Sequence, residues 1–414
     1  SGNTRDAWAS GLGPARRNHT HMNRSCRTEL DPTAAQREAF VRACGVARWA
    51  WNFGLRRCEE ERAAGRKRPT AIDLSKEVVR LKAAECAWLG ETSKWVPAEA
   101  LRDLEATWKR FFAARKAGQR YGRPRFKRKR DGAGSFRVYR AVVKRDRVMI
   151  PRVGWVRLKE RGYLPEGKDM RATVTYQAGR WYVTVLAELE PAPPKTTGEV
   201  LGVDLGIKTL ATLSDGTTFA NHRFLAQAER RMRMLSKAVS RKRKGSSNRR
   251  KAVRRLARLH QRIANCRRDA LHKTSHAITK RAQTIVVEDL NVSGMVQNRR
   301  LSKAVSDASM GELRRQLVYK AEARGVTVIT AGRFYPSSKT CSKCGDVKET
   351  LTLAERTFSC SCGLVIDRDV NAAISLRNLA AGSAVSACRL GSAGLGTFAQ
   401  VKLPIGQEPE VGVV

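Results

Sequence analysis

Four of the ten cysteines lie close together in the last quarter of the chain, and they constrain its fold more than any other feature does. They form a CxxC pair and a CxC pair that fifteen residues separate: Cys341, Cys344, Cys360 and Cys362. A glycine follows each pair, where a tight turn favours a positive φ. Four thiolates complete a tetrahedral Zn²⁺ shell without an open position, so the pattern predicts a structural zinc site rather than a catalytic one. The CxC pair is tighter than usual, and four unrelated free thiols are the alternative.

The charge of the chain indicates what it binds. The 414 residues carry a formal net charge of +43, from 81 Lys and Arg against 38 Asp and Glu. This self-repulsion predicts a polyanionic partner and excludes an acidic binding module. Hydrophobic residues at 42% and eight tryptophans are sufficient for real cores, which excludes a disordered basic tail, a collagen-like chain and a coiled-coil rod.

The sequence contains no signal for export or for a membrane. No apolar stretch is long enough to cross a bilayer, and the polar residues 1–23 lack the apolar region of a secretory signal. We expect this leader to be disordered. The remaining cysteines are scattered singly and are expected to be reduced thiols: Cys26, Cys44, Cys58, Cys86, Cys266 and Cys388. The expected location is therefore the cytoplasm of a prokaryote, with action at the nucleoid.

The spacing of apolar residues changes along the N-terminal half, from the period of a helix to that of a strand. Residues 24–32 predict a short strand, and residues 33–130 have the helical spacing of apolar residues, ending in a basic loop. Residues 131–190 alternate with period two and predict four or more antiparallel strands, with Ala178-Gly179 as a hairpin turn. The Pro-rich residues 191–195 are a stiff linker and the first domain boundary.

The C-terminal half has an α/β order of elements. Residues 196–337 and 366–380 contain apolar strands and helices, among them the helical run 221–283 with 21 Lys and Arg against two acids. The run 306–325 is expected to be one amphipathic helix. The cysteine segment, residues 338–365, is inserted as a zinc ribbon, and residues 381–414 are expected to be a flexible tail.

Acidic residues stand at the ends of apolar elements. Asp204 follows Leu-Gly-Val, Glu288 follows Ile-Val-Val, and Asp367 and Asp369 begin a helix. A buried carboxylate is costly without a compensating cation. If Asp204, Glu288 and Asp369 converge, their oxygens suit Mg²⁺ or Mn²⁺, and two such ions support phosphodiester hydrolysis. Taken singly, each acid also fits a turn, an exposed strand end or a helix cap.

Basic clusters are candidates for contacts with nucleic acid. One lies in the basic loop of the N-terminal half and another within the basic helical run. The candidate residues are Arg123, Arg125, Lys127, Arg128, Lys129, Arg130, Arg241, Lys242, Arg243, Lys244, Arg249 and Arg250. A solvated helix face of mixed charge is the alternative, and the scarcity of acids argues against it.

Several aromatic residues fit either a core or a surface that stacks on bases. Trp49, Trp51, Trp108 and Phe112 stand at helical spacing, so a position in the core is favoured for them. Phe334 and Tyr335 are open between the two interpretations.

Three segments, GVDLGIKTLAT, IVVEDLNVSGM and DRDVNAA, resemble the motifs of a RuvC-type nuclease core. The cysteine segment precedes the third motif, as in the TnpB family of transposon-encoded nucleases and in compact type V CRISPR effectors. The segments LDPTAAQREAF and GRPRFKRKRDGAGSFRV are also similar to TnpB. The resemblance covers residues 28–380.

The resemblance implies a multidomain α/β fold with a ribonuclease H-like (RuvC) nuclease core. The zinc ribbon is then an insert that binds target nucleic acid. A wedge-type β-barrel, residues 24–32 and 131–190, carries an inserted helical recognition domain, residues 33–130. Asp204, Glu288 and Asp369 correspond to the catalytic, metal-binding acids, with Asp367 and Asp289 as near alternatives.

The resemblance also implies partners: a guide RNA, and double-stranded target DNA beside a short flanking motif. Single-stranded DNA is a further candidate target, and a monomer is expected rather than a dimer. The expected function is that of an RNA-guided DNA endonuclease with structural Zn²⁺ and catalytic Mg²⁺ or Mn²⁺. The alternatives are a guided repressor that does not cleave and a zinc-ribbon RNA-binding protein. Whether the chain is transposon-encoded or CRISPR-associated stays open.

Overall fold

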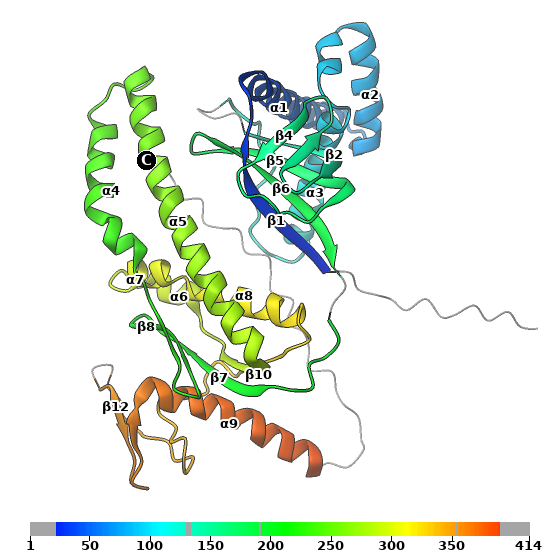
Figure 1. The fold of residues 1–414 in the computed structure, drawn as a ribbon. Coiled ribbons are helices and arrows are strands. Elements are labelled where there is room, and N and C mark those ends of the chain that lie inside the picture. Colours follow the sequence, from blue (N-terminus) through cyan, green and yellow to red (C-terminus); the bar gives the residue numbers. More distant parts are fainter. Residues whose placement is uncertain (1–21, 130–133, 190–191, 353–354, 390–414) are drawn as a thin grey trace, which may run out of the picture. The chain divides into compact units, whose positions relative to one another are not determined.

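A computed structural model describes residues 22–129, 134–189, 192–352 and 355–389 (Figure 1). The chain forms two compact units. The first contains the residues up to 194 together with 222–275 and 322–325, and the second contains the remainder. The range that the sequence assigns to the nuclease domain thus includes a segment that groups with the first unit. No helix among the described residues is long and apolar enough to span a bilayer.

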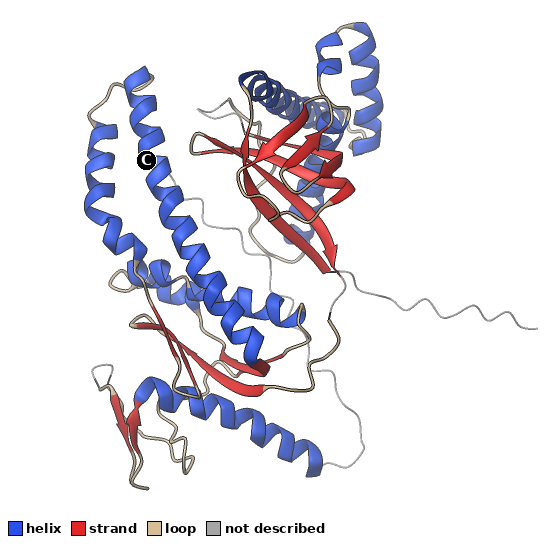
Figure 2. Ribbon diagram, in the orientation of Figure 1, coloured by secondary structure: helices blue, strands red, loops and turns tan. Residues whose placement is uncertain are grey.

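A closed β-barrel with the strand order β1-β4-β3-β2-β5-β6 is the centre of the first unit (Figure 2). Its strands are β1 (Met22–Asp31), β2 (Ser135–Val143), β3 (Arg147–Ile150), β4 (Gly154–Leu158), β5 (Gly167–Gln177) and β6 (Arg180–Leu189). Alternate residues such as Val138, Val148 and Val183 are fully buried inside it. Ala178 and Gly179 both have positive φ, 51° and 86°, as the hairpin turn requires. The barrel that the resemblance implied is confirmed.

Helices are inserted between the first two barrel strands, as the sequence predicts. They are α1 (Ala34–Ala63), α2 (Ala71–Ala84), the 3-10 helix η1 (Ala87–Glu91) and α3 (Trp95–Lys116). Thr33 begins α1 with a capping box: its hydroxyl accepts from the Gln36 N–H, and the Gln36 side chain accepts from the Thr33 N–H. Gly54 brings α1 close to α3, because a Cβ there would lie 2.7 Å from Leu101.

Apolar and charged contacts join these helices to the barrel. Phe40 of α1 packs against Phe136 and Trp181, with ring centroids 5.7 and 5.0 Å away. Arg137 of β2 pairs with two acids of α3, Asp103 at 2.9 Å and the buried Glu99 at 3.5 Å. Arg102 of α3 also pairs with Glu99, at 2.6 Å, so the buried carboxylate is compensated, and the contacts of Arg137 join the helical insert to the barrel.

The second unit contains a five-stranded sheet with the order β11-β10-β7-β8-β9. The strands are β7 (Glu199–Leu205), β8 (Thr209–Leu213), β9 (Thr218–Ala220), β10 (Ala282–Glu288) and β11 (Thr327–Ala331). β7, β10 and β11 are parallel, whereas β8 is antiparallel to β7 and β9 to β8. The predicted turn at Asp215-Gly216 joins β8 to β9, with Gly216 at φ 84°.

Helix α9 (Arg368–Arg389) packs on this sheet over β7 (Figure 1). The close approach requires glycine at position 202, since a Cβ there would lie 1.9 Å from the Ala373 carbonyl oxygen and 2.7 Å from the Arg377 nitrogen. α9 continues to Arg389, so the first residues of the segment expected to be a tail are helical. Residues 390–414 lie outside the described part of the chain.

The remaining helices differ from the prediction at one point. α4 (Phe224–Ser240) and α5 (Ser247–Arg281) form the basic helical run, with a turn at 241–246. α6 (Val292–Gln297) and α7 (Ser302–Ala308) precede α8 (Met310–Glu322). The run 306–325 is not one helix, because Ser309 adopts a left-handed conformation, φ 53°, and ends α7 there.

The packing of α9 on β7 gives a first prediction. We expect Gly202→Ala to destabilise the second unit by about 3 kcal/mol or more, because the added methyl group meets backbone rather than a movable side chain. Gly311→Ala in α8 is the matched control, since its Cβ would meet only ordinary contacts at 3.7 Å and alanine favours a helix. Urea unfolding of both variants measures this. A Gly202→Ala protein as stable as Gly311→Ala would contradict the packing described.

Candidate active site and zinc site

Asp204 and Glu288 lie at the same end of neighbouring parallel strands. Val203 of β7 pairs in register with Val287 of β10, so the acid that follows each valine occupies the equivalent position. Residues two apart in a strand share a face, and Gly202 faces α9, so Asp204 also points to the side of the sheet that α9 covers. Asp369 lies in the first turn of α9, one helical turn before Ala373. Strand and helix packing therefore directs the three predicted acids toward one region.

The electrostatics of Asp204 reflect this arrangement. Its side chain is half-buried, and the loss of hydration raises its pKa from 3.8 to about 8. The like charges of Glu288 and then Asp369 add to the rise, and Arg368 opposes it. Glu288 and Asp369 are half-buried as well. Three carboxylates that repel one another in a poorly hydrated place are a donor set that fits a divalent cation.

The acids are less tightly gathered than the cysteines. Among the described residues, the four cysteines are the metal-ligand group whose atoms all lie within 4.8 Å of one another. Asp369 is held by Arg368, with a guanidinium nitrogen 3.2 Å from its Oδ1. Glu288 accepts a short hydrogen bond from the hydroxyl of Ser337, a buried residue that the sequence analysis did not single out.

The two near alternatives have other partners. Asp367 accepts hydrogen bonds from the N–H groups of Asp369 and Val370 at 2.9 and 3.1 Å, so it caps α9. Asp289 is held between two arginines: Arg314 lies 2.7 Å from its Oδ1 and Arg333 2.9 Å from its Oδ2. These contacts, the hydrogen bond of Arg314 above all, lower the pKa of Asp289. Asp369 also has an arginine partner, Arg368, but its charge raises the pKa of Asp204 more than that of Asp367 does. This difference favours Asp369 as the third acid.

The four predicted cysteines come together in the ribbon. Cys341 Sγ lies 3.6 Å from Cys362 Sγ, and Cys344 Sγ lies 3.6 Å from Cys360 Sγ. A tetrahedral Zn²⁺ with Zn–S bonds near 2.3 Å separates its sulfurs by about 3.8 Å, so the group fits the ion. Gly345 and Gly363 have φ of 82° and 83°, as the predicted turns require. The strands β12 (Thr357–Ser359) and β13 (Val365–Asp367) form the hairpin of the ribbon.

Asn371, which no sequence pattern singles out, connects the ribbon to α9. Its Oδ1 accepts from the Ser342 N–H at 3.0 Å, and its Nδ2 donates to the Thr340 carbonyl at 2.7 Å. Those two residues flank Cys341, the first cysteine of the group. Asn371 is fully buried, so it fixes the first zinc knuckle to the helix that carries Asp369.

The predicted nucleic-acid contacts lie on exposed segments. Of those in the basic helical run, Arg241 to Lys244 occupy the turn between α4 and α5 and are exposed. Arg249 and Arg250 lie in the first turn of α5, where Arg249 is half-buried and Arg250 is exposed. In the basic loop, Arg123 pairs with Glu59 at 3.2 Å, and the Lys127 ammonium lies 3.9 Å from the centre of the Trp51 ring. Arg130 lies outside the described residues. Binding by these side chains stays a prediction.

Three models of protein families match parts of this chain. A model described as "Probable transposase" (OrfB, IS605) matches residues 182–299, and one described as "Cas12f1-like, TNB domain" matches residues 311–376. A third, described as "Helix-turn-helix domain" (OrfB, IS605), matches residues 22–67. In this structure residues 22–67 form β1 and the single helix α1.

Curated relatives cover most of the chain. A Streptomyces pristinaespiralis protein named "Putative RNA-guided DNA endonuclease" is 35% identical over 89% of this chain and 91% of its own length. InsQ of Escherichia coli (strain K12), which has the same description, is 34% identical over 92% of this chain and 96% of its own. This chain belongs to the TnpB family.

More distant similarity extends to CRISPR effectors. The endodeoxyribonuclease Cas12f1 of Sulfoacidibacillus thermotolerans is 28% identical to this TnpB-family chain over 49% of the chain and 50% of its own length. A solved Cas12f1 complex with sgRNA and target DNA matches with a TM-score of 0.34 and 13% identity, over 86% of this chain and 99% of that one.

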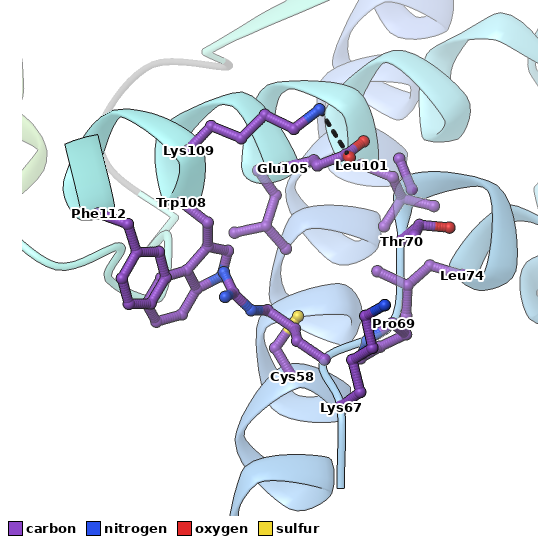
Figure 3. Close-up of a pocket in the computed structure, with 13 residues that line it drawn as sticks. Cys58, Lys67, Pro69, Thr70, Leu74, Leu101, Glu105, Trp108, Lys109 and Phe112 are labelled. Atoms are coloured by element: carbon purple, nitrogen blue, oxygen red, sulfur yellow. Dashed lines mark ion pairs between the residues drawn. The ribbon is translucent and has the colours of Figure 1, made fainter.

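The aromatic residues of the TnpB-family helical insert are divided between core and surface. Trp51 and Trp108 are buried, as favoured from the sequence, whereas Phe112 is 44% exposed. Trp108 and Phe112 line a pocket of about 420 Å³ between α2 and α3, together with Cys58, Lys67 and Leu74 (Figure 3). The guanidinium of Arg68 covers both rings at 4.5 and 4.6 Å. No local sequence pattern indicates this pocket.

Phe334 and Tyr335, which the sequence left open, take opposite positions. Tyr335 packs beside Val286 and Leu376, and its hydroxyl donates to the Ser375 carbonyl at 3.3 Å. Phe334 is 93% exposed, more than any other large apolar residue that the structure describes.

The cysteine group predicts the effect of losing one ligand. We expect Cys344→Ser to lower the zinc content from about one ion per chain to near zero and to unfold the ribbon, because closed four-cysteine sites depend on the metal for folding. Elemental analysis and amide hydrogen exchange over residues 341–367 measure both effects. Cys266→Ser, a lone cysteine in α5, is the matched control and should keep the ion. Full zinc content in Cys344→Ser would contradict the assignment.

The raised pKa of Asp204 predicts a dependence of stability on pH. Without divalent ions the folded protein keeps a proton on Asp204 up to about pH 8, whereas the unfolded chain loses it near pH 4. The folded state therefore binds the extra proton between these values, and the contribution of Asp204 to stability falls as the pH rises through this window. The asparagine side chain in Asp204→Asn does not titrate, so this variant lacks that dependence of stability on pH.

We therefore expect Asp204→Asn in EDTA to melt a few degrees above the native chain at pH 9, with a smaller difference at pH 5. Glu322→Gln, an exposed acid at the end of α8, is the control and should show no such trend. Calorimetry at pH 5 and pH 9 measures the melting temperature of each protein. A lower melting temperature for Asp204→Asn at pH 9 would show that Asp204 is stabilising in the ion-free protein.

Proposed function

We propose that this chain is an RNA-guided DNA endonuclease that hydrolyses phosphodiester bonds at Asp204, Glu288 and Asp369. The observation that carries the proposal is the direction of these acids, from β7, β10 and α9, toward one region where their charges repel one another. The names of the relatives that cover most of the chain describe the same activity. The other two motif acids have different partners: Asp289 pairs with Arg314, and Asp367 accepts a hydrogen bond from the backbone N–H of Asp369.

The three acids would hold Mg²⁺ or Mn²⁺, which activates water and stabilises the leaving oxygen in phosphodiester hydrolysis. The chain supplies the position of each ligand. Ser337 orients the Glu288 carboxylate through its hydroxyl, and Arg368 orients Asp369. Asp289 keeps Arg314 and Arg333 beside the acids, where their positive charge favours an approaching phosphate.

We propose a ribonuclease H-like (RuvC) core for the second unit. The sheet order β11-β10-β7-β8-β9, with β8 antiparallel to β7 and β10 parallel to it, supports this assignment. The barrel with residues 33–130 is proposed as the wedge and recognition region for the guide RNA and the flanking motif. The zinc ribbon is proposed to bind target nucleic acid, and the exposed basic residues of the loop and the helical turn to bind phosphates.

The two alternatives are less well supported. A guided repressor has no need of three acids that repel one another, because their repulsion only destabilises a protein that does not bind a cation there. A zinc-ribbon RNA-binding protein explains the cysteines but neither Asp204 nor Glu288. The relatives are named as endonucleases, which agrees with cleavage.

Cleavage of a guide-matched plasmid tests the proposal. The protein is purified with its guide RNA, and the RNA is sequenced to define the target. In Mg²⁺ the native chain should cut, and Asp204→Ala or Glu288→Ala should cut at least about 100-fold more slowly, because a lost ligand removes several kcal/mol of transition-state stabilisation. EDTA should abolish cutting.

Glu322→Gln serves as the control and should cut at the native rate, since its carboxylate lies on the exposed end of α8. Cleavage by Asp204→Ala at the native rate would remove the catalytic assignment. Guide-dependent binding of the plasmid by the native chain without any cutting would favour the repressor instead.

A further inference from the structure

Phe334 is exposed although the residues on both sides of it make side-chain hydrogen bonds to the second unit. Its side chain is 93% exposed. An apolar ring that stays in water contributes no hydrophobic stabilisation, and other aromatic rings of this protein are buried in its cores. The exposure has a local cause: Tyr335 N–H donates to the Gly332 carbonyl at 2.9 Å, so Arg333 and Phe334 occupy the two central positions of a β-turn.

Contacts on both sides of Phe334 hold this turn. On one side, the Arg333 guanidinium bonds Asp289 at 2.9 Å. On the other side, Tyr335 donates to the Ser375 carbonyl of α9, and the Ser337 hydroxyl bonds Glu288. Thr340, at the end of the loop, is held through its carbonyl by Asn371 at 2.7 Å. The turn is therefore fixed to the end of β10 and to α9, the elements that carry two of the three acids.

These contacts place Phe334 at the edge of the candidate active site. The residue before it bonds Asp289, and a residue three places after it bonds Glu288. Consecutive Cα atoms are about 3.8 Å apart, so the short chain from Arg333 to Ser337 keeps the Phe334 ring near Asp289 and Glu288. A rigid aromatic ring that faces solvent beside basic side chains has the chemistry that stacks on an unpaired base.

We propose that Phe334 stacks on an unpaired base of the DNA strand at the acids and so holds that strand in position for cleavage. The inference rests on the proposed function and adds to it a positioning residue for the single-stranded substrate. Stacking tolerates any base, because every base has a π-face, so Phe334 contributes affinity without adding a sequence requirement.

Single-turnover cleavage of guide-matched DNA tests the inference with the full chain and its guide RNA. Phe334→Ala should cleave at least about 5-fold more slowly, which is the effect of losing one stacked base. Phe334→Trp should restore the rate, because tryptophan also stacks. Val296→Ala, an exposed apolar residue of α6, is the matched control and should leave the rate unchanged.

Fluorescence provides a second readout that does not need cleavage. In an Asp204→Ala background, single-stranded DNA is labelled with 2-aminopurine at successive positions, and quenching at one position should disappear on Phe334→Ala and return with Phe334→Trp. Zinc content and melting temperature check that both variants fold.

Native cleavage rates in Phe334→Ala, unchanged quenching, or a Phe334→Trp protein no better than Phe334→Ala would overturn stacking. If the native chain does not cleave but quenching depends on Phe334 as described, the proposed function fails while the stacking site stands.

Discussion

Three carboxylates whose charges oppose one another, those of Asp204, Glu288 and Asp369, are the main constraint on the second unit. Asp204 is raised to a pKa of about 8 because burial removes its hydration and because Glu288 and Asp369 are close enough to oppose its charge. Ionising Asp204 in this arrangement costs free energy, and the protein without a divalent ion avoids that cost by keeping the Asp204 proton up to about pH 8. Gathering these carboxylates therefore reduces stability when they are ionised, and the surrounding packing has to hold them against their repulsion.

Two devices oppose that repulsion. Gly202 lets the backbone of α9 approach β7 so closely that no other residue fits there, which fixes the helix that carries Asp369. The cysteine ribbon is attached to the same helix, because the buried Asn371 of α9 forms hydrogen bonds with both residues that flank Cys341. A zinc ion held by the four cysteines would thus have a structural effect on the acids, although such a site has no open position for a substrate. Ser337 and Tyr335, in the loop between the sheet and the ribbon, complete this support.

Much of this could be predicted from the sequence, and the reasons for the failures are physical. The cysteine pairs, the alternation of residues 131–190 and the apolar runs around Asp204 and Glu288 are local patterns, and the structure contains the elements they predict. The break at Ser309 was missed because a left-handed serine has no strong sequence signal. Ser337 and Asn371 were missed because their partners are distant in the chain. The exposure of Phe334 could not be decided, since the pattern around it fits burial equally well.

The sequence by itself determined the kinds of chemistry available: four thiolates at metal-binding spacing, carboxylates at the ends of apolar strands, and a charge of +43 suited to a polyanion. These follow from residue type and local spacing, which the chain carries whatever its fold. Only the tertiary structure decided that Asp289 pairs with Arg314 and Arg333, because both arginines are distant from it in the chain. The helix cap at Asp367 is a local contact that the sequence already allowed. The tertiary structure likewise turned Tyr335 inward and Phe334 outward, since contacts with Ser375 and Gly332 exist only after β10, α9 and the loop between them have packed.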